Sequence, residues 1–320
     1  MRLLWTALAV LWCACAWAQA PGSGTAAGQP APAQKQENIP TFRADVNLVN
    51  VYVTVADRAG APVGGLTEDD FQLFEDEVPQ KISVFARESE LPLSIVVALD
   101  TSLSTRKDLQ LELAAARDFV KSILRPQDRL ALYQFSQEVQ EVVPFTSDMR
   151  SIDQGLKRVH VGAATALYDA IYLGSRALSR RQGRKVMVVI TDGGDTMSQV
   201  DYQEALRQAQ IADTLVYSII DVPIAASAGR NTGGEHALIQ IANDTGGKYY
   251  YAVSDEDLKR AFQKVSEELR TQYLLGYYPL KRLTDSDYRR IEVRLKPDAG
   301  PRFAGLSPRH RAGYYTSKAE

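Results

Sequence analysis

The spacing of hydrophobic residues changes twice along the chain and divides it into three regions. In residues 41–90 apolar side chains recur mostly at every second position, which is the period of a half-buried strand. The segment "FRADVNLVNVYVTVAD" shows this alternation, with one slip near Asn50 that suggests a bulge. Two more short strands are predicted in "DFQLFED" and "QKISVFARE". We therefore expect residues 41–90 to form a small β unit.

The middle region, residues 91–270, alternates continuous apolar runs with amphipathic segments. The apolar runs predict strands at 93–99, 129–135, 185–191, 215–220 and 248–252. The amphipathic segments predict helices at roughly 106–124, 166–180, 201–212, 235–244 and 255–270. Apolar strands that alternate with helices indicate a parallel sheet covered on both faces. The predicted fold class is α/β, with a Rossmann-like, doubly wound and mostly parallel sheet.

One segment of this region departs from the parallel pattern. "QEVQEVVPFTSD" follows the second strand too closely to leave room for a crossover helix. We expect it to return as a single antiparallel edge strand.

The strand period returns in residues 271–320. "YLLGYYPL", "YRRIEVRLKP" and "RAGYYTS" alternate aromatic or aliphatic residues with polar ones. Neither end of the chain has enough strands to bury a face alone, because isolated hairpins are marginally stable. We predict that the C-terminal strands pair with the N-terminal unit and flank the α/β domain.

The first residues are expected to direct export rather than to join the fold. "MRLLWTALAVLWCACAWAQA" has an early Arg2, an apolar stretch and then small residues, as a signal peptide does. We predict a signal peptide at 1–18, with cleavage after Ala20 and a retained membrane anchor as the alternatives. Residues 19–40 are rich in Pro, Gly and Ala and predict a flexible tether. The protein is therefore expected to be secreted or periplasmic, with no transmembrane span in the mature chain.

Both cysteines of the chain, Cys13 and Cys15, lie in this predicted signal peptide. Cleavage would leave a mature chain without cysteine, so no disulfide is expected to support it in an oxidising compartment. Acylation of one cysteine, as in a lipoprotein, is the alternative.

Composition, charge and the absence of known catalytic motifs limit the classes of function to be expected. A net charge of −2, with 45% hydrophobic and 24% charged residues, is ordinary for a globular protein and gives no reason to expect a nucleic-acid partner. The three histidines, His160, His236 and His310, form no H-E-x-x-H motif, and neither a G-x-S-x-G elbow nor a P-loop is present. We expect a protein that is not an enzyme, because no general base for a metal-dependent hydrolase can be identified.

Polar side chains follow the core strands at the sheet edge where open α/β sheets bind ligands. Asp100, Ser102 and Ser104 come directly after the first core strand, and Asp192 follows the strand at 185–191. Thr165 lies in a Gly/Ala-rich loop before a helix. A set of oxygen ligands without sulfur or imidazole selects a hard divalent cation, Mg²⁺ first and then Ca²⁺ or Mn²⁺. We expect Asp100 to lie on a solvent-facing loop.

Each of these residues has a simpler alternative role. Ser, Thr and Asp between a strand and a helix are frequent N-caps, and Thr165 would suit the helix that begins "ALYDAI". The D-x-S-x-S spacing and the agreement of three loops at one edge favour the metal site.

The motifs resemble the metal-ion-dependent adhesion site of the von Willebrand factor type A domain. They are "DTSLS" at 100–104, Thr165 in "GAATALYDAI" and Asp192 in "ITDGGDT". The resemblance implies that Ser102, Ser104 and Thr165 supply hydroxyl ligands, and that Asp100 and Asp192 act directly or through water. The chain departs from many members at Leu103, where they carry Gly. The flanking segments are similar to a secreted bacterial branch of the family, over residues 42–316.

This resemblance implies an adhesion-type module that binds a protein partner. An acidic side chain of the partner would complete the coordination of the bound cation. The alternative is a structural or assembly subunit of a cell-envelope complex, which would use the same domain for a permanent contact.

Overall fold

The computed structural model describes residues 48–87, 91–103, 109–222, 232–280, 288–296 and 303–316. The predicted signal peptide and tether lie outside these residues. None of the described helices is both long enough and apolar enough to span a membrane.

A six-stranded sheet forms the middle of the chain, with strand order β10-β9-β8-β5-β6-β7. Its strands are β5 (Leu93–Asp100), β6 (Arg129–Phe135), β7 (Val139–Thr146), β8 (Arg184–Thr191), β9 (Thr214–Asp221) and β10 (Tyr249–Ala252). All neighbours pair in parallel except β7, which is antiparallel to β6 at the edge. The predicted α/β class and the single antiparallel edge strand are therefore confirmed.

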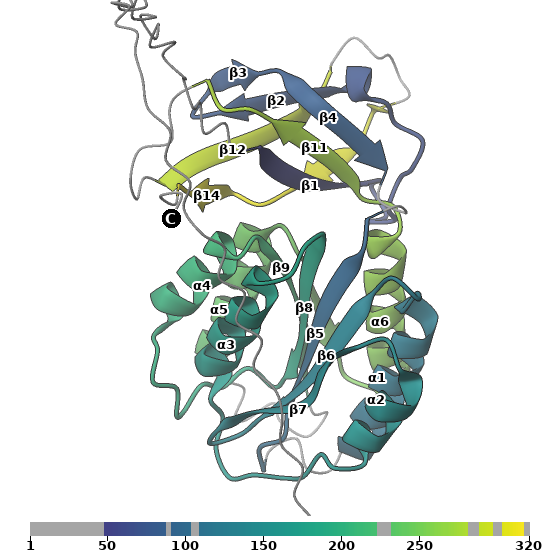
Figure 1. Ribbon diagram of the computed structural model, residues 1–320, viewed down its shortest axis with the longest axis vertical. Helices are drawn as coiled ribbons and strands as arrows, with labels where there is room; N and C mark the ends of the chain where they lie inside the picture. The colour runs from purple at the N-terminus through teal and green to yellow at the C-terminus, as the bar shows by residue number, and fades with distance from the viewer. Residues whose placement is uncertain are drawn as a thin grey trace, which may run out of the picture. The chain divides into compact units, whose positions relative to one another are not determined.

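Helices cover both faces of this sheet (Figure 1). They are α1 (Leu109–Ile123), α2 (Met149–Leu156), α3 (Leu167–Ser179), α4 (Tyr202–Ile211), α5 (Thr232–Thr245) and α6 (Asp255–Leu269). Helices α1, α2 and α6 pack on one face and α3, α4 and α5 on the other, each group around its own hydrophobic core. All eight residues of β5 are buried, because both faces of the strand are covered.

Helix α2 was not predicted from the pattern of apolar residues. It is only two turns long and buries two large apolar side chains, Ile152 and Leu156. The signal for its start is Asp148, whose carboxylate accepts hydrogen bonds from the backbone N–H groups of Arg150 and Ser151.

The two ends of the chain form two four-stranded sheets around a shared core. Their orders are β13-β1-β11-β4 and β14-β12-β2-β3. The N-terminal elements are β1 (Val49–Ala56), the 3₁₀ turn Glu68–Asp70, β2 (Phe71–Glu75), β3 (Val78–Gln80) and β4 (Ile82–Arg87). The C-terminal strands are β11 (Tyr273–Tyr277), β12 (Tyr288–Leu295), β13 (Ser307–Arg309) and β14 (Gly313–Tyr315). Strand β11 lies between β1 and β4, and β12 lies between β14 and β2, so each sheet combines strands from both ends.

The bulge suggested near Asn50 is not found, because β1 keeps an unbroken antiparallel register with β11 from Val49 to Val53. The slip in the pattern has another cause, which is burial on both faces of the strand. Val51 and Val53 belong to the core between the two sheets, whereas Tyr52 packs into the core of the α/β domain.

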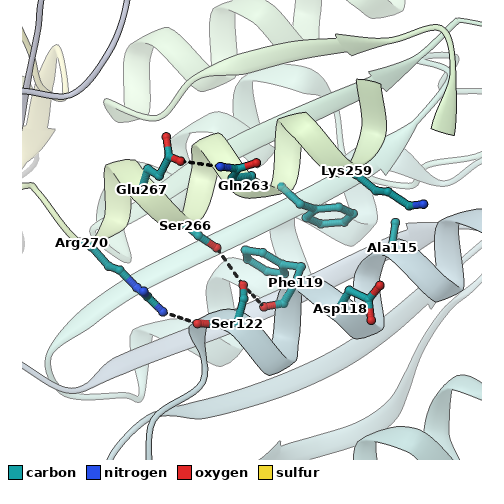
Figure 2. A pocket seen from close by; sticks show the side chains of 10 residues that line it. Ala115, Asp118, Phe119, Ser122, Lys259, Gln263, Ser266, Glu267 and Arg270 are labelled. Carbon is teal, nitrogen blue, oxygen red and sulfur yellow. Dashed lines mark hydrogen bonds between the residues drawn. The ribbon is translucent and has the colours of Figure 1, made fainter. Parts of the chain in front are cut away.

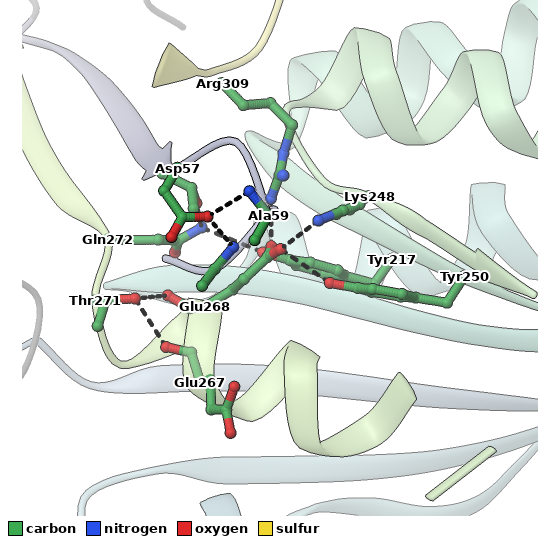
Figure 3. A network of polar contacts seen from close by, with 12 residues as sticks. Asp57, Ala59, Tyr217, Lys248, Tyr250, Glu267, Glu268, Thr271, Gln272 and Arg309 are labelled. Atoms are coloured by element: carbon green, nitrogen blue, oxygen red, sulfur yellow. Dashed lines mark hydrogen bonds and ion pairs between the residues drawn. The ribbon is translucent and has the colours of Figure 1, made fainter. Parts of the chain in front are cut away.

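A buried carboxylate ties the end of α6 to a C-terminal strand (Figure 3). Glu268 Oε1 accepts hydrogen bonds from Lys248 Nζ at 3.2 Å and from the Tyr250 hydroxyl at 2.9 Å. Glu268 Oε2 forms an ion pair with the Arg309 guanidinium of β13. The carboxylate is only 2% exposed, so these partners compensate for its loss of hydration.

Candidate metal centre

Asp100 and Thr191 are the last residues of the adjacent parallel strands β5 and β8. Thr191 Oγ1 donates a hydrogen bond of 2.6 Å to Asp100 Oδ2, and the backbone N–H of Ser102 donates one of 2.9 Å to Asp100 Oδ1. Asp100 is completely buried, so the expectation that it lies on a solvent-facing loop is wrong. The carboxylate belongs to the strand end, and its hydrogen bonds hold it in one orientation.

Burial raises the pKa of the Asp100 carboxyl to about 6. Hydrogen bonds from Thr191 and Ser102 lower this pKa, and the neighbouring Asp192 carboxylate raises it further. The charge on a buried carboxylate is costly, and a second carboxylate nearby adds to that cost. A divalent cation beside them would offset that cost.

The loop that carries Thr165 contacts the residues that follow β5 and β6. The N–H of Gly162 donates to the carbonyl oxygen of Thr101 at 2.7 Å, and the N–H of Ala166 donates to that of Ser136 at 2.6 Å. Thr165 is 5% exposed.

The alternative role of Thr165 as the N-cap of α3 is wrong. The N-cap position is Ala166, which offers no side chain for capping. The first N–H groups of α3, those of Leu167 and Tyr168, donate to Asp195 Oδ1 at 2.9 and 3.4 Å. The capping role is therefore filled by a residue from the loop after β8.

Asp192 begins that loop, directly after β8, and is half-buried. It does not cap the next helix, because Asp201 accepts from the N–H of Glu204 at the start of α4. Gly193 has a φ of +97°, in the region that favours glycine. A Cβ atom on Gly234 of α5 would lie 1.3 Å from the Gly193 carbonyl oxygen, so the loop and the helix meet where only glycine fits.

Four of the five predicted ligands lie among the described residues. Asp100 forms hydrogen bonds with Ser102 and interacts electrostatically with Asp192, and Thr165 lies on the adjoining loop. Ser104 lies outside the described residues. In the part of the chain that the structure describes, no group of three or more His, Cys, Asp or Glu side chains gathers as a metal site.

The donor chemistry at this edge fits a hard divalent cation. The side chains of Asp100, Ser102, Thr165 and Asp192 offer carboxylate and hydroxyl oxygens, which Mg²⁺, Ca²⁺ and Mn²⁺ accept in preference to softer ligands. A bound cation would supply positive charge at the sheet edge and an attachment point for an anionic group.

Two residues of this region were not singled out from the sequence. Thr191 orients Asp100, and Asp195 caps α3 from a distance of 28 residues along the chain. The available signal was the string "ITDGGDT", which places a hydroxyl before the first Asp and a second Asp three residues after it.

A separate hollow lies between α1 and α6 (Figure 2). The rings of Phe119 and Phe262 stack there, with centroids 4.8 Å apart, and the hydroxyls of Ser122 and Ser266 lie 3.2 Å from each other. All of its lining residues come from these two helices and the residue that follows α6. The hollow is therefore not part of the candidate metal centre.

The fold and the site together define a Rossmann-like α/β domain with oxygen side chains at the carboxyl edge of its sheet. The family model of the von Willebrand factor type A domain matches residues 94–267 of the 320-residue chain. The chain therefore belongs to the von Willebrand factor type A domain family.

Individual proteins that are similar in sequence are only distant relatives. Integrin alpha-X from Homo sapiens is 26% identical over 214 residues, which cover 62% of this chain and 18% of that protein. An uncharacterized protein from Borreliella burgdorferi is 25% identical over 200 residues, which cover 54% of this chain and 58% of that one. The chain thus spans less than two thirds of the length of either relative.

A solved structure of a von Willebrand factor type A protein from Catenulispora acidiphila is similar in fold. The TM-score is 0.50 and the identity 11%, over 87% of this chain and 76% of that one. This similarity concerns the fold alone.

Proposed function

We propose that this chain is a secreted or periplasmic, non-enzymatic module that binds a protein partner through a divalent cation. Asp100, Ser102, Ser104, Thr165 and Asp192 would hold the cation, with Mg²⁺ as the first candidate. An acidic side chain of the partner would complete the coordination sphere. In a partly desolvated site, the remaining positive charge would anchor that carboxylate strongly.

One observation carries this proposal. Asp100 is a fully buried carboxylate with an elevated pKa that interacts with the Ser102 hydroxyl and with a second carboxylate, that of Asp192, while Thr165 lies buried on the adjoining loop. The capping roles that would otherwise explain Thr165 and Asp192 are filled by Asp195 and Asp201. Thr165 and Asp192 therefore do not serve as caps of α3 and α4, and both lie at the sheet edge where ligands bind in folds of this class.

The first experiment measures Mg²⁺ binding by calorimetric titration. Asp100→Asn is the informative variant, because its amide oxygen can still accept from the Ser102 N–H and its NH2 group can donate to the Thr191 hydroxyl, while the charge is lost. We expect this variant to lose Mg²⁺ binding and to keep its thermal stability in chelator. Asp118→Asn, on the exposed side of α1, is the matched control and should bind as the wild type does. Equal affinity in wild type and Asp100→Asn would refute the metal assignment.

The second experiment concerns the partner. Immobilised wild-type protein is incubated with cell-envelope extract in Mg²⁺ or in chelator, beside the Asp100→Asn variant. The proposal requires a protein that is retained by wild type in Mg²⁺ and released by chelator, and that the variant does not retain. A constitutive complex that is insensitive to chelator would instead support the assembly-subunit function.

A further inference from the structure

Three hydrogen bonds connect the loop after β8 to the backbone of Thr165. The N–H groups of Thr196 and Met197 both donate to the Thr165 carbonyl oxygen, at 2.9 and 3.1 Å. In return, the Thr165 N–H donates to Thr196 Oγ1 at 3.0 Å. The backbone of Thr165 is therefore bound on both its N–H and its C=O side by the loop that begins with Asp192.

Asp195 extends this connection to the start of α3. Its Oδ1 atom accepts from the N–H groups of Leu167 and Tyr168 at 2.9 and 3.4 Å. Ser198 Oγ donates to the same Oδ1 atom and also accepts from the N–H of Asp169 at 3.1 Å. A helix that lacks a capping side chain of its own is thus capped from the neighbouring loop.

A second carboxylate makes the connection reciprocal. Asp169, in the first turn of α3, accepts at Oδ1 from the N–H groups of Gln199 and Val200 at 2.9 and 3.0 Å. The loop therefore holds the helix through Asp195, and the helix holds the loop through Asp169. Because each segment accepts hydrogen bonds from backbone N–H groups of the other, residues 165–169 and 192–200 form one hydrogen-bonded unit.

We propose that Asp195 is a positioning residue of the candidate metal centre. Asp195 lies three residues after Asp192 and binds α3 two residues after Thr165, so it sets the position of Thr165 relative to Asp192 without itself being a ligand. This inference rests on the proposed cation site. Partners that orient metal ligands in this way typically affect metal affinity by about 10–100-fold.

The test separates positioning from a simple effect of charge. Asp195→Ala removes both the acceptor and the charge, whereas Asp195→Asn keeps an oxygen acceptor that caps helices well. Asp201→Ala is the matched control, because it removes the equivalent cap of the adjacent helix α4. All variants are made in the full chain and titrated with Mg²⁺ by calorimetry.

We expect Asp195→Ala to bind Mg²⁺ at least about tenfold more weakly, and Asp195→Asn and Asp201→Ala to bind nearly as wild type. Wild-type affinity in Asp195→Ala would overturn the proposal. It would also be overturned if Asp195→Asn were as weak as Asp195→Ala, because charge alone would then account for the effect.

A measurement without metal distinguishes failure of this proposal from failure of the proposed function. Amide hydrogen exchange in chelator is followed at Leu167 and Tyr168 of α3 and at Thr196 and Met197 of the loop. In Asp195→Ala we expect both pairs to exchange faster together, whether or not the wild type binds Mg²⁺. Faster exchange at Leu167 and Tyr168 with unchanged protection at Thr196 and Met197 would show that the two segments are not coupled, and would overturn the positioning role.

Discussion

Glu75 and Arg289 form an ion pair of 2.7 Å between the adjacent strands β2 and β12, and their side chains are 2% and 5% exposed. The other oxygen of Glu75 accepts from the hydroxyls of Tyr277 and Tyr314 at 2.6 and 2.8 Å. The four residues come from four strands and from both sheets of the β unit. This network therefore joins the N-terminal and C-terminal parts of the chain inside their shared core.

Glu75→Gln should destabilise the β unit strongly. The substitution leaves the Arg289 guanidinium buried without its counter-charge, and breaking a buried pair in this way costs about 3–5 kcal/mol of unfolding free energy. Urea denaturation measures the loss. Glu292→Gln is the control, because Glu292 pairs with Arg294 on the surface and its loss should change stability little. Similar stability of the two variants would contradict the role given to Glu75.

Gly234→Ala should disturb both α5 and the candidate metal centre. Alanine would favour the helix by roughly 1 kcal/mol in an open position. Here its Cβ atom would lie 1.3 Å from the Gly193 carbonyl oxygen, and overpacking of this kind costs about 1–3 kcal/mol, so the clash should prevail. We expect a lower melting temperature and weaker Mg²⁺ binding, since Gly193 follows Asp192 directly.

Gly64→Ala provides the comparison, because nothing lies within 4 Å of the added carbon. It should leave both the melting temperature and Mg²⁺ affinity unchanged or slightly improved. If Gly234→Ala behaves in the same way, the close approach of α5 to the loop does not constrain the site.

Removal of residues 272–320 should expose the N-terminal strands to protease. The truncation takes away β11, which lies between β1 and β4, and β12, which pairs with β2. Limited proteolysis followed by mass spectrometry should show new cleavage within residues 48–87. Continued protection of these residues in the truncated protein would mean that the N-terminal strands are stable without their C-terminal partners.

His310 should make the stability of the protein depend on pH. Burial lowers the pKa of its imidazole below the ordinary value of 6.5, although a hydrogen bond to the Arg311 backbone and the nearby Glu292 carboxylate oppose this shift and the Arg311 guanidinium adds to it. Above pH 6.5 both the folded and the unfolded state carry a neutral ring. As the pH falls below 6.5 the unfolded state takes up its proton first, so stability is lost between that value and the lower pKa of the folded state.

The matching variant is His310→Gln, because His310 Nε2 accepts from the N–H of Val293 and a glutamine oxygen can replace it. Urea midpoints at pH 7.5 and pH 5.5 are compared for both proteins. The wild type should lose more stability on acidification than the variant. An equal loss would show that other groups cause the pH dependence.

The central sheet is predictable because its signal is local. The buried strand β5 is almost entirely apolar, and a helix follows every parallel strand except β6, which the edge strand β7 follows directly. The pattern near Asn50 misleads because β1 is buried on one face by its partner sheet and on the other by the α/β domain. The burial against the α/β domain depends on tertiary packing, so it does not produce a regular hydrophobic period in the sequence.

The candidate site shows the same division between local and tertiary information. Asp100 and Asp192 are predictable because each directly follows an apolar strand. The hydrogen bond that orients Asp100 is not predictable, since its donor, Thr191, belongs to the neighbouring strand β8. The capping of α3 by Asp195 is likewise hidden, because Thr165 has the expected residue type and stands at the expected place.

The pairing of strands from opposite ends of the chain has a consequence for the time at which the β unit can form. Tyr277 and Glu75, which meet in its core, are 202 residues apart in the chain. At a synthesis rate of about 5–20 residues per second, strand β2 would wait roughly 10–40 s for its partners to be made. During that interval the N-terminal strands carry unpaired edges, which are prone to aggregate, while the α/β domain between them is still being synthesised. The N-terminal strands are thus made before the α/β domain but gain their partners only after it, so they are the strands most in need of protection from aggregation during synthesis.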